Sequence, residues 1–485
     1  MGFDFDPQQR RELGYKLIDR INDYFTSLPD RSVQLPDERR TFSALTDSMP
    51  GLGDDAARVL DEVCSELIDK GFHVPAANYF GLMNPTPAYM AVLAEALVAA
   101  LNPQLATLAR SQLASKIENE TVRWIGERVG WPADQPFGGT FTSGGNEANF
   151  TALALALAHA FPSYVEEGLL SVGTQPVFYC SGEAHHSLDK SAGLLGLGRR
   201  AVRRIKVNAR VQLDPARLED AIADDLDRGL RPFAVIATAG TTNSGAIDDI
   251  ASLSAIARRH DLWLHVDGAY GAAAIFSDTH RDLVRGIELA DSITIDPHKW
   301  LAMPFSAGVI LTSHPDMLVE TFGVSTPYMP KIPGATQIDN FKLSTQWSRR
   351  MNSLKLYLAL RVHGRIAYQQ LIADQLALAS RLAASITASQ EFELAAPQTL
   401  PILNLRLKSR DRLGENDLER YHKQIVEAVT RDGRRWISHT HVDGRSVIRL
   451  MIISYLTTQQ HIDALWDALR SAATNVFPQQ IAARR

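Results

Sequence analysis

One lysine of the sequence stands where it could act as a nucleophile. Lys299 follows a short apolar run in the segment Asp291–Trp300, DSITIDPHKW, a pattern typical of a buried strand and the turn after it. Because a strand interior disfavours an unpaired ammonium group, a lysine there can have a lowered pKa and form a Schiff base. An isolated lysine would more simply extend its amine into solvent. Lys299 is not isolated, because four further motifs occupy similar positions.

An aspartate follows another apolar run, in the segment His265–Gly271, HVDGAYG. The carboxylate of Asp267 could hydrogen-bond a protonated ring nitrogen and so keep the ring an electron acceptor. The alternative is a helix N-cap or turn aspartate, which is common. The small residues Gly268 and Ala269 would let a flat ring approach the backbone.

Two glycine-containing segments could bind phosphate. In Phe141–Asn149, FTSGGNEAN, a strand end leads into a helix start, where exposed backbone N–H groups, with the side chains of Ser143 and Asn146 nearby, could hold one phosphate. An ordinary capped helix explains this string equally well. Gly193–Gly198, GLLGLG, suggests a dinucleotide loop, but it follows no clear strand and we discount it.

Two more motifs lie at the ends of inferred strands. EAHHS contains His185, whose imidazole could stack on a flat ring, although a lone histidine is more often a surface or satisfied core residue. ATAGTTNSG contains Thr241 at the carboxyl edge of the sheet, where open α/β sheets bind ligands. Each motif alone is weak evidence. Their coincidence at strand ends within one lobe indicates a shared site.

The elements that position these motifs alternate between short apolar runs and helical stretches from about residue 88 onward. This rhythm predicts a mostly parallel α/β sheet with helices on both faces. Residues 8–27 and 55–71 predict two amphipathic helices that cannot bury their own apolar stripes, so a partner subunit is a candidate cover. The predicted strands are 138–143, 177–180, 233–238, 262–266, 292–295 and 308–311, and the predicted later helices are 147–160, 250–260 and 352–384.

Composition narrows the possible partners and compartment. With 45% apolar and 22% charged residues and a net charge of -5, the 485-residue chain is an ordinary globular protein with no reason to bind nucleic acid or an anionic membrane. The fourteen histidines form no metal-ligand cluster along the sequence, so we expect no metal. Two distant cysteines, a polar acidic N-terminus and the absence of a long apolar run favour the cytoplasm.

The order TSGGNEA, AHHS, GTT, HVDGAYG and DPHKW resembles the group II pyridoxal 5′-phosphate (PLP)-dependent amino-acid decarboxylases, which include aromatic-L-amino-acid, glutamate and histidine decarboxylases. The resemblance spans nearly the whole chain, and the set of motifs is highly specific. It implies a type I PLP fold with a mostly parallel, seven-stranded-type sheet. The implied divisions are an N-terminal helical arm over 1–88, a PLP-binding α/β domain over 89–350 and a small α+β domain over 351–485. It also implies a homodimer with active sites at the interface.

The resemblance assigns roles to particular residues. Lys299 would carry PLP as a Schiff base, and Asp267 would pair with the pyridine nitrogen. His185 would stack on one ring face, with Ala269 against the other. A threonine would lie near the ring or the phosphate. Thr241 is assigned to this position, but the adjacent Thr242 could occupy it instead. The implied cofactor-binding residues are Gly145, Asn146, His185, Thr241, Asp267, Ala269, His298 and Lys299.

Residues 324–339 resemble the family's mobile catalytic loop. The loop contains Tyr328, where decarboxylases of this family keep a tyrosine thought to protonate the substrate carbanion in the neighbouring subunit's site. Aldehyde-forming relatives often carry phenylalanine there. The alternative is a surface loop that happens to hold a tyrosine.

Three positions depart from the family pattern. Asp296 stands where animal decarboxylases have a phosphate-contacting asparagine, so a carboxylate there would repel the phosphate unless it points elsewhere or is neutralised. Asn146 replaces a serine or threonine. In the segment that shapes the substrate pocket, Leu82 and Met83 fall where aromatic-specific enzymes have aromatic residues, and that segment supplies the predicted substrate-pocket residues Tyr79, Phe80, Leu82 and Met83.

The resemblance therefore implies a lyase that decarboxylates an L-amino acid, aromatic or related, through a quinonoid intermediate to give an amine and CO2. The alternative on the same fold is an oxidative deaminase that forms an aldehyde from a modified amino acid. Aminotransferase chemistry, or a catalytically inactive binding subunit, are further alternatives, since a fold does not fix a reaction. Arg349 and Arg350 do not indicate an acidic substrate, because that stretch also occurs in enzymes with other substrates.

Overall fold

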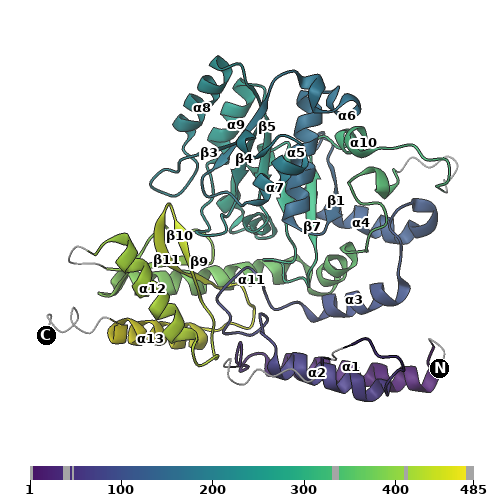
Figure 1. Ribbon diagram of the computed structural model, residues 1–485, viewed down its shortest axis with the longest axis vertical. Coiled ribbons are helices and arrows are strands. Elements are labelled where there is room, and N and C mark those ends of the chain that lie inside the picture. The colour runs from purple at the N-terminus through teal and green to yellow at the C-terminus, as the bar shows by residue number, and fades with distance from the viewer. Residues whose placement is uncertain (1–3, 36–43, 46–47, 330–337, 409–412, 477–485) are drawn as a thin grey trace.

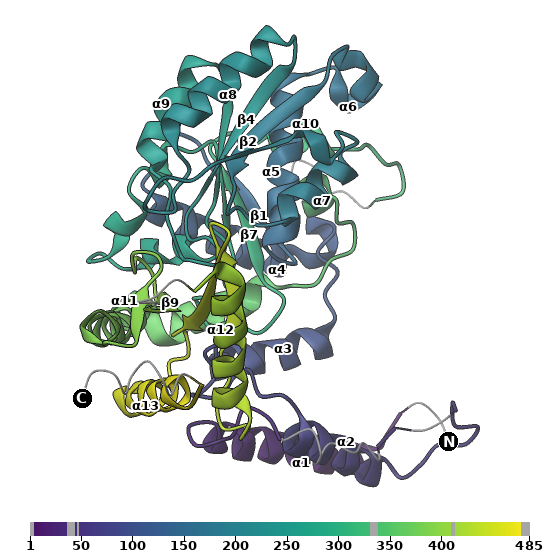
Figure 2. The same ribbon diagram turned by 60° about the vertical axis from the view of Figure 1, so that its left-hand side comes forward.

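The computed structural model describes residues 4–35, 44–45, 48–329, 338–408 and 413–476. Figure 1 shows a large lobe built on a central sheet, a smaller lobe beside it, and a pair of N-terminal helices below both. Figure 2, turned by 60°, shows the same three parts. In the described residues, no helix is long and apolar enough to cross a membrane.

The central sheet has seven strands in the order β1-β7-β6-β5-β4-β2-β3. The strands from β6 to β3 run parallel to one another, while β7 is antiparallel to both β1 and β6. The strands are β1 (Gly138–Thr142), β2 (Pro176–Ser181), β3 (Val202–Ile205), β4 (Arg231–Thr238), β5 (Trp263–Asp267), β6 (Ser292–Ile295) and β7 (Gly308–Thr312).

Both faces of this sheet are buried under helices, which is why its central strands read as continuous apolar runs. Because side chains alternate along a strand, Val177 and Tyr179 of β2 enter one core while Phe178 and Cys180 enter the other. The first core is covered by α4 (Leu108–Val129), α8 (Pro215–Asp227), α9 (Ile250–Arg259) and the start of α11 (Ser353–Ala388); the second is covered by α5 (Gly145–Ala160), α7 (Ser187–Leu194) and α10 (Asp316–Phe322), with the short α6 (Tyr164–Glu167) nearby.

The small lobe is a four-stranded antiparallel sheet, β10-β11-β9-β8, packed against helices. Its apolar core joins the second half of α11 to both later helices and to β9 and β11. Its elements are β8 (Phe392–Leu394), β9 (Ile402–Leu407), α12 (Glu415–Thr430), β10 (Ser438–Val442), β11 (Arg445–Met451) and α13 (Gln459–Val476).

The N-terminal helices α1 (Pro7–Ser27) and α2 (Ala56–Lys70) contain no buried residue. They contact each other, with Lys16 paired to Asp61, and lie apart from the sheet (Figures 1 and 2). The next helix, α3 (Tyr89–Leu101), packs on α11. Apolar side chains therefore remain exposed on the helical arm: Tyr15, Leu17, Ile18, Val59, Val63 and Leu67.

The α/β fold class predicted from the sequence is confirmed, including the seven-stranded sheet and the α+β lobe. Two local differences have physical causes. Strand β3 was not predicted, because its sequence VRRI carries two arginines and resembles an exposed segment. Helix α5 begins at Gly145, two residues before the predicted start. Its N-cap residue is Gly144, so no capping side chain marks the start of the helix in the sequence.

Candidate active site

A cavity lies at the carboxyl ends of β4, β5 and β6, beside the first turn of α5. The register of these strands places Thr238, Asp267 and Thr294 side by side at this edge of the sheet. Asp267 and Lys299 both line the cavity, although 32 residues separate them in sequence. Parallel strands bring such residues together because their carboxyl ends meet at one edge.

Lys299 forms an ion pair inside the cavity. Its Nζ lies 3.0 Å from Oδ2 of Asp296, a side chain that is only 2% exposed. The turn between the two residues is closed by the Lys299 amide, which donates to the carbonyl oxygen of Asp296 at 2.9 Å. The other carboxylate oxygen of Asp296, Oδ1, is buried and has no hydrogen-bond partner in the described part of the chain. The departure from the family pattern at Asp296 thus places a carboxylate directly on the predicted catalytic lysine.

Asp267 is held by two hydrogen bonds at the end of β5. Its Oδ2 accepts from Nδ2 of Asn149 at 2.8 Å, and its Oδ1 accepts from the backbone amide of Ala269 at 3.2 Å. Asn149 lies on α5, which crosses the sheet above this strand, and its Nδ2 also donates to Oγ of Ser187. The carboxylate is thereby fixed in orientation where it faces the cavity.

Behind Asn149 lies a buried histidine that fixes the amide in turn. Nε2 of His265 lies 3.1 Å from Oδ1 of Asn149, and Nδ1 lies 2.9 Å from Oγ of Ser292. Burial lowers the pKa of His265 to about 4, so the ring is neutral and carries one proton. Nδ1 also lies 3.1 Å from the carbonyl oxygen of Ser292, so both ring nitrogens contact fixed polar groups and the ring is held in one orientation. Thr294 donates to Oδ1 of Asn149 at 2.8 Å.

The first turn of α5 forms the wall of the cavity next to Asp296. The N-cap Gly144 supplies no side-chain cap, and the amides of Gly145 and Asn146 precede the first helical hydrogen bonds. A Cβ at Gly145 would lie 2.8 Å from Oδ2 of Asp296, so glycine is required by close approach. His298 lies behind this turn, where Nδ1 accepts from the Ala307 amide and burial lowers the ring's pKa.

Other predicted residues lie around the same space. His185 lines the cavity, its Nδ1 accepts from the Ser187 amide, and partial burial lowers its pKa. Ala269 lines the cavity as well. Thr241 points into a buried turn, where its hydroxyl bonds to Ser244 at 2.6 Å, and the next residue, Thr242, lines the cavity instead.

The four predicted substrate-pocket residues separate in space. Met83 lines the cavity. Tyr79 stacks on Trp436 at a ring separation of 5.6 Å, and Phe80 is fully buried in the small-lobe core. Leu82 is 43% exposed.

The loop tyrosine lies outside the cavity of its own chain. Tyr328 is 71% exposed and stacks on Trp347 at a ring separation of 6.4 Å. Residues 330–337 of the predicted loop lie outside the described residues.

Sequence reasoning did not single out three members of the site. Asn149 and His265 stand at the ends of quoted motifs, and Thr294 lies in the strand before Lys299. The residue types of these three positions did not indicate a role in the sequence, because their role depends on contacts between α5, β5 and β6. The arginines set aside in the sequence are both engaged: Arg349 pairs with buried Glu118, and Arg350 pairs with Glu95.

The fold and the site define a class of protein. Residues 39–408 match the family described as the pyridoxal-dependent decarboxylase conserved domain, and the chain belongs to that family. It is a PLP-dependent amino-acid carboxy-lyase.

Individual relatives cover nearly the full length. The chain is 29% identical to an aromatic-L-amino-acid decarboxylase of Bacillus atrophaeus, over 97% of this chain and 96% of the relative. It is 28% identical to a 4-hydroxyphenylacetaldehyde synthase of Rhodiola rosea, over 97% of each chain. A crystal structure of Oryza sativa TDC with PLP and tryptamine shares the fold, with a TM-score of 0.91, 24% identity, and coverage of 98% of this chain and 99% of that one.

The residues at the cavity fit PLP. Three buried polar atoms of lining residues have no partner in the described residues: Oδ1 of Asp296, Oη of Tyr270 and Oγ1 of Thr238. Buried polar groups are rarely left unpaired unless a ligand or water completes them. The helix start at Gly145 offers amides to an anion, and Asp267 offers a carboxylate to a cationic ring nitrogen. The phosphate and the ring nitrogen of the cofactor therefore each have a matching group.

Proposed function

We propose that this enzyme decarboxylates an L-amino acid, aromatic or related, to give the amine and CO2, with Lys299 as the residue that binds PLP. The observation that carries the proposal is the convergence of Lys299, Asp267 and His185 on one cavity at the carboxyl edge of the sheet. The described cavity lining contains the apolar Met83 and no arginine, which favours a substrate side chain without negative charge.

Bound PLP supplies an electron sink for the bond that breaks between Cα and the carboxylate. Asp267 would hold the proton on the ring nitrogen, because its carboxylate is fixed by Asn149 and cannot turn away. Lys299 would hold the cofactor through its amine and exchange with the substrate amine. His185 and Ala269 would keep the ring flat between them, and Gly145 and Asn146 would hold the phosphate end. His298 is not among the described residues that line the cavity and would support this end from behind Gly144. Thr242 takes the place beside the ring that the sequence assigned to Thr241 or its neighbour.

Asp296 would receive the proton of the Lys299 ammonium when the amine becomes a nucleophile. Its Oδ2 already forms an ion pair with Nζ at 3.0 Å, and its Oδ1 is unpaired in the described residues. A neutral amine is required for attack on a carbonyl carbon, so a base in contact with Nζ supports this step.

Tyr328 would protonate Cα of the substrate in the active site of a second copy of the chain. The exposure of its ring, which is not part of the described lining of its own chain's cavity, supports a role across an interface. The exposed apolar side chains of α1 and α2 support the same homodimer, since an amphipathic helix of this kind needs a cover. Light scattering of the full chain should give twice the monomer mass, and a monomer with full activity would refute the shared site.

We further propose the divisions 1–88, 89–350 and 351–485 and a cytoplasmic location. Separate apolar cores in the large and small lobes support a division into two lobes, with α11 contributing its first part to one core and its end to the other. Cys64 and Cys180 are both free thiols, which supports a reducing compartment.

The product distinguishes the two functions of this family that remain open. Purified PLP-loaded enzyme is incubated with pooled L-amino acids in an oxygen electrode, and products are followed by mass spectrometry. Amine formation without oxygen uptake is the expected result and identifies the substrate. Aldehyde formation with oxygen uptake would make the chain an aldehyde synthase.

That second function is favoured by the similarity to the Rhodiola rosea 4-hydroxyphenylacetaldehyde synthase. Tyr328 argues against it, since aldehyde formation requires that the carbanion escape protonation. Tyr328→Phe should therefore shift products partly from amine to aldehyde. An unchanged product ratio would remove Tyr328 as the proton donor.

A further inference from the structure

Two histidines and a glutamate lie together on the small lobe, away from the cavity that holds Lys299. His439 and His441 are two residues apart on β10, the edge strand, so their side chains leave the same face of the sheet. Glu419 reaches this face from α12. One potential ligand atom of each residue lies within 4.8 Å of the other two, and Nε2 of His441 is 3.6 Å from Oε2 of Glu419.

The orientation of His439 is fixed by a chain of buried groups. Nε2 of His422 accepts from the Leu407 amide at 3.1 Å, so its Nδ1 carries the proton and donates to Oγ of Ser446 at 2.8 Å. The same oxygen lies 2.9 Å from Nε2 of His439. In the described residues Nδ1 of His439 has no hydrogen-bond partner. Metal-binding histidines commonly donate their second ring N–H to an oxygen in this way.

We propose that His439, His441 and Glu419 form a binding site for a divalent transition-metal ion of the Zn²⁺ class. Two imidazoles and one carboxylate are ligands that this class prefers, and a fourth position would be filled by water. Ligand atoms around tetrahedral zinc lie about 3.3 Å apart, given bonds of about 2.0–2.1 Å. The present separations of up to 4.8 Å close to that value by side-chain rotation, which the exposure of His441 permits.

One neighbouring charge sets the strength of this site. Nζ of Lys423 lies 2.5 Å from Oε1 of Glu419, so the ammonium competes with a metal for the carboxylate. Lys423 is mostly exposed, and it uses the carboxylate oxygen that does not face His441. The metal can bind while Lys423 swings into solvent, and removal of the lysine should strengthen binding.

The ion would join β10 to α12 and so stiffen the hairpin β10–β11. Between the two histidines, Thr440 donates to Oδ1 of Asn243 at 3.0 Å, and Asn243 adjoins the cavity-lining Thr242. At the hairpin turn, the amide of Asp443 donates to Glu183, two residues before His185. The metal site therefore lies on the segment through which the small lobe contacts the active-site loops.

The test is calorimetric titration of Zn²⁺ into untagged holoenzyme that has first been treated with a chelator. Wild type should bind at a saturable site of one ion per chain, and thermal unfolding should shift upward with Zn²⁺. Both His441→Gln and Glu419→Gln change exposed or half-buried groups and should weaken binding at least about tenfold. Lys423→Ala should bind more tightly than wild type. His363→Gln, an exposed histidine on α11, is the matched control and should bind as wild type does.

The outcomes decide the proposal without reference to catalysis. Weaker binding in the first two variants with unchanged binding in the control supports the site. Absence of a saturable site in wild type, or equal affinity in wild type and His441→Gln, would overturn it. His439→Gln, with folding checked by circular dichroism, distinguishes a three-residue site from one formed by His441 and Glu419 alone.

Discussion

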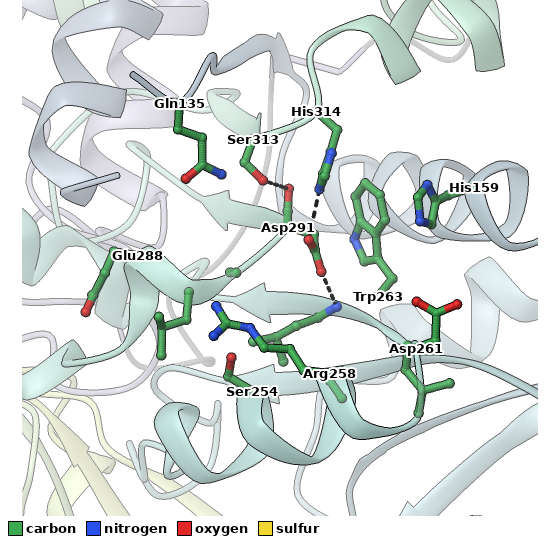
Figure 3. A pocket seen from close by; sticks show the side chains of 15 residues that line it. Gln135, His159, Ser254, Arg258, Asp261, Trp263, Glu288, Asp291, Ser313 and His314 are labelled. Atoms are coloured by element: carbon green, nitrogen blue, oxygen red, sulfur yellow. Dashed lines mark hydrogen bonds and ion pairs between the residues drawn. The ribbon is translucent and has the colours of Figure 1, made fainter. Parts of the chain in front are cut away.

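The central sheet has a cavity at each end, and the two differ in how their polar groups are paired. Within the described residues, the cavity at the carboxyl ends holds three buried side-chain atoms without a partner, on Asp296, Tyr270 and Thr238. The second, larger cavity lies at the amino ends of β5 and β6 (Figure 3). None of its lining residues has a buried side-chain nitrogen or oxygen without a partner in the described part of the chain.

Figure 3 shows how Asp291 is paired in the second cavity. Asp291 uses both carboxylate oxygens: Oδ1 pairs with Nε2 of His314 at 2.9 Å, and Oδ2 accepts from the Leu264 amide at 2.7 Å. Helix α5 links the two cavities, since its first turn lies at the cofactor cavity and His159, in its last turn, lines the second cavity. The comparison teaches that unpaired buried polarity locates the site better than cavity size, because burial of an unpaired polar group costs stability unless a ligand offsets it.

The largest difference between the two ends should appear when the carboxylate that faces the ring is neutralised. Asp267→Asn keeps the shape of the side chain and removes the charge that holds the ring nitrogen protonated. We expect turnover to fall by several orders of magnitude with PLP still bound, measured by CO2 release and visible absorbance. Near-normal turnover would remove the electron-sink role of Asp267.

A smaller loss of turnover is expected when Asn149, which holds Asp267 in place, is replaced. Asn149→Ala removes the donor to Oδ2 of Asp267 and the side-chain contact to Nε2 of His265. Loss of a hydrogen bond to a charged group costs about 1.5–3 kcal/mol, which corresponds to a fall in kcat of roughly 10- to 100-fold. Turnover equal to wild type in a correctly folded variant would show that the Asn149–His265 chain does not orient Asp267.

The sequence predicted the cofactor lysine and aspartate but not this chain of support. Asp267 ends one strand and Lys299 follows another, and the apolar residues of both strands can be recognised in the sequence. Asn149, His265 and Thr294, which form this chain, lie on three elements, α5, β5 and β6, and Asn149 is 118 residues from the aspartate that it orients. The same reason hid the candidate metal site, where only the His-x-His spacing of His439 and His441 is visible and Glu419 arrives from another element.

The sequence also could not predict which of several neighbouring residues faces the cavity. Two adjacent threonines could equally approach the ring, and only the turn that buries the Thr241 hydroxyl against Ser244 separates them. For the substrate segment, Tyr79 and Phe80 carry the apolar character of pocket residues, yet their side chains pack against Trp436 and the small-lobe core. Apolar residue types in the sequence do not distinguish a residue that lines a pocket from one that packs against the small lobe.

A change of only a few-fold, in the affinity for PLP, is expected when the ion pair of Lys299 is removed. Asp296→Asn keeps a hydrogen-bond acceptor beside Nζ while removing a negative charge next to the phosphate end of the cavity. We expect PLP to bind several-fold more tightly, measured by absorbance titration of the apoenzyme, with slower attachment to Lys299 because the base is lost. Weaker PLP binding would show that the ion pair, and not charge repulsion, dominates at this position.

At the opposite end of the sheet the expected effect is smallest. His314→Gln breaks the partly exposed pair with Asp291, and such pairs contribute about 0–1 kcal/mol to stability. Unfolding by denaturant should shift by no more than this amount, with kcat unchanged. A substantial loss of activity would mean that the second cavity takes part in catalysis and would break the comparison.

The central claim is that the cofactor binds the lysine at the carboxyl end of the sheet. The chain offers a natural competitor: Lys355 is also buried, burial lowers its pKa, and its Nζ donates to the carbonyl oxygen of Ser306 at 2.5 Å and pairs with Glu95 at 2.6 Å. Reduction of the holoenzyme with borohydride, followed by proteolysis and mass spectrometry, locates the pyridoxyl group. We predict the label on Lys299 and its loss in Lys299→Ala. A label on Lys355, or on any other lysine, would contradict the account.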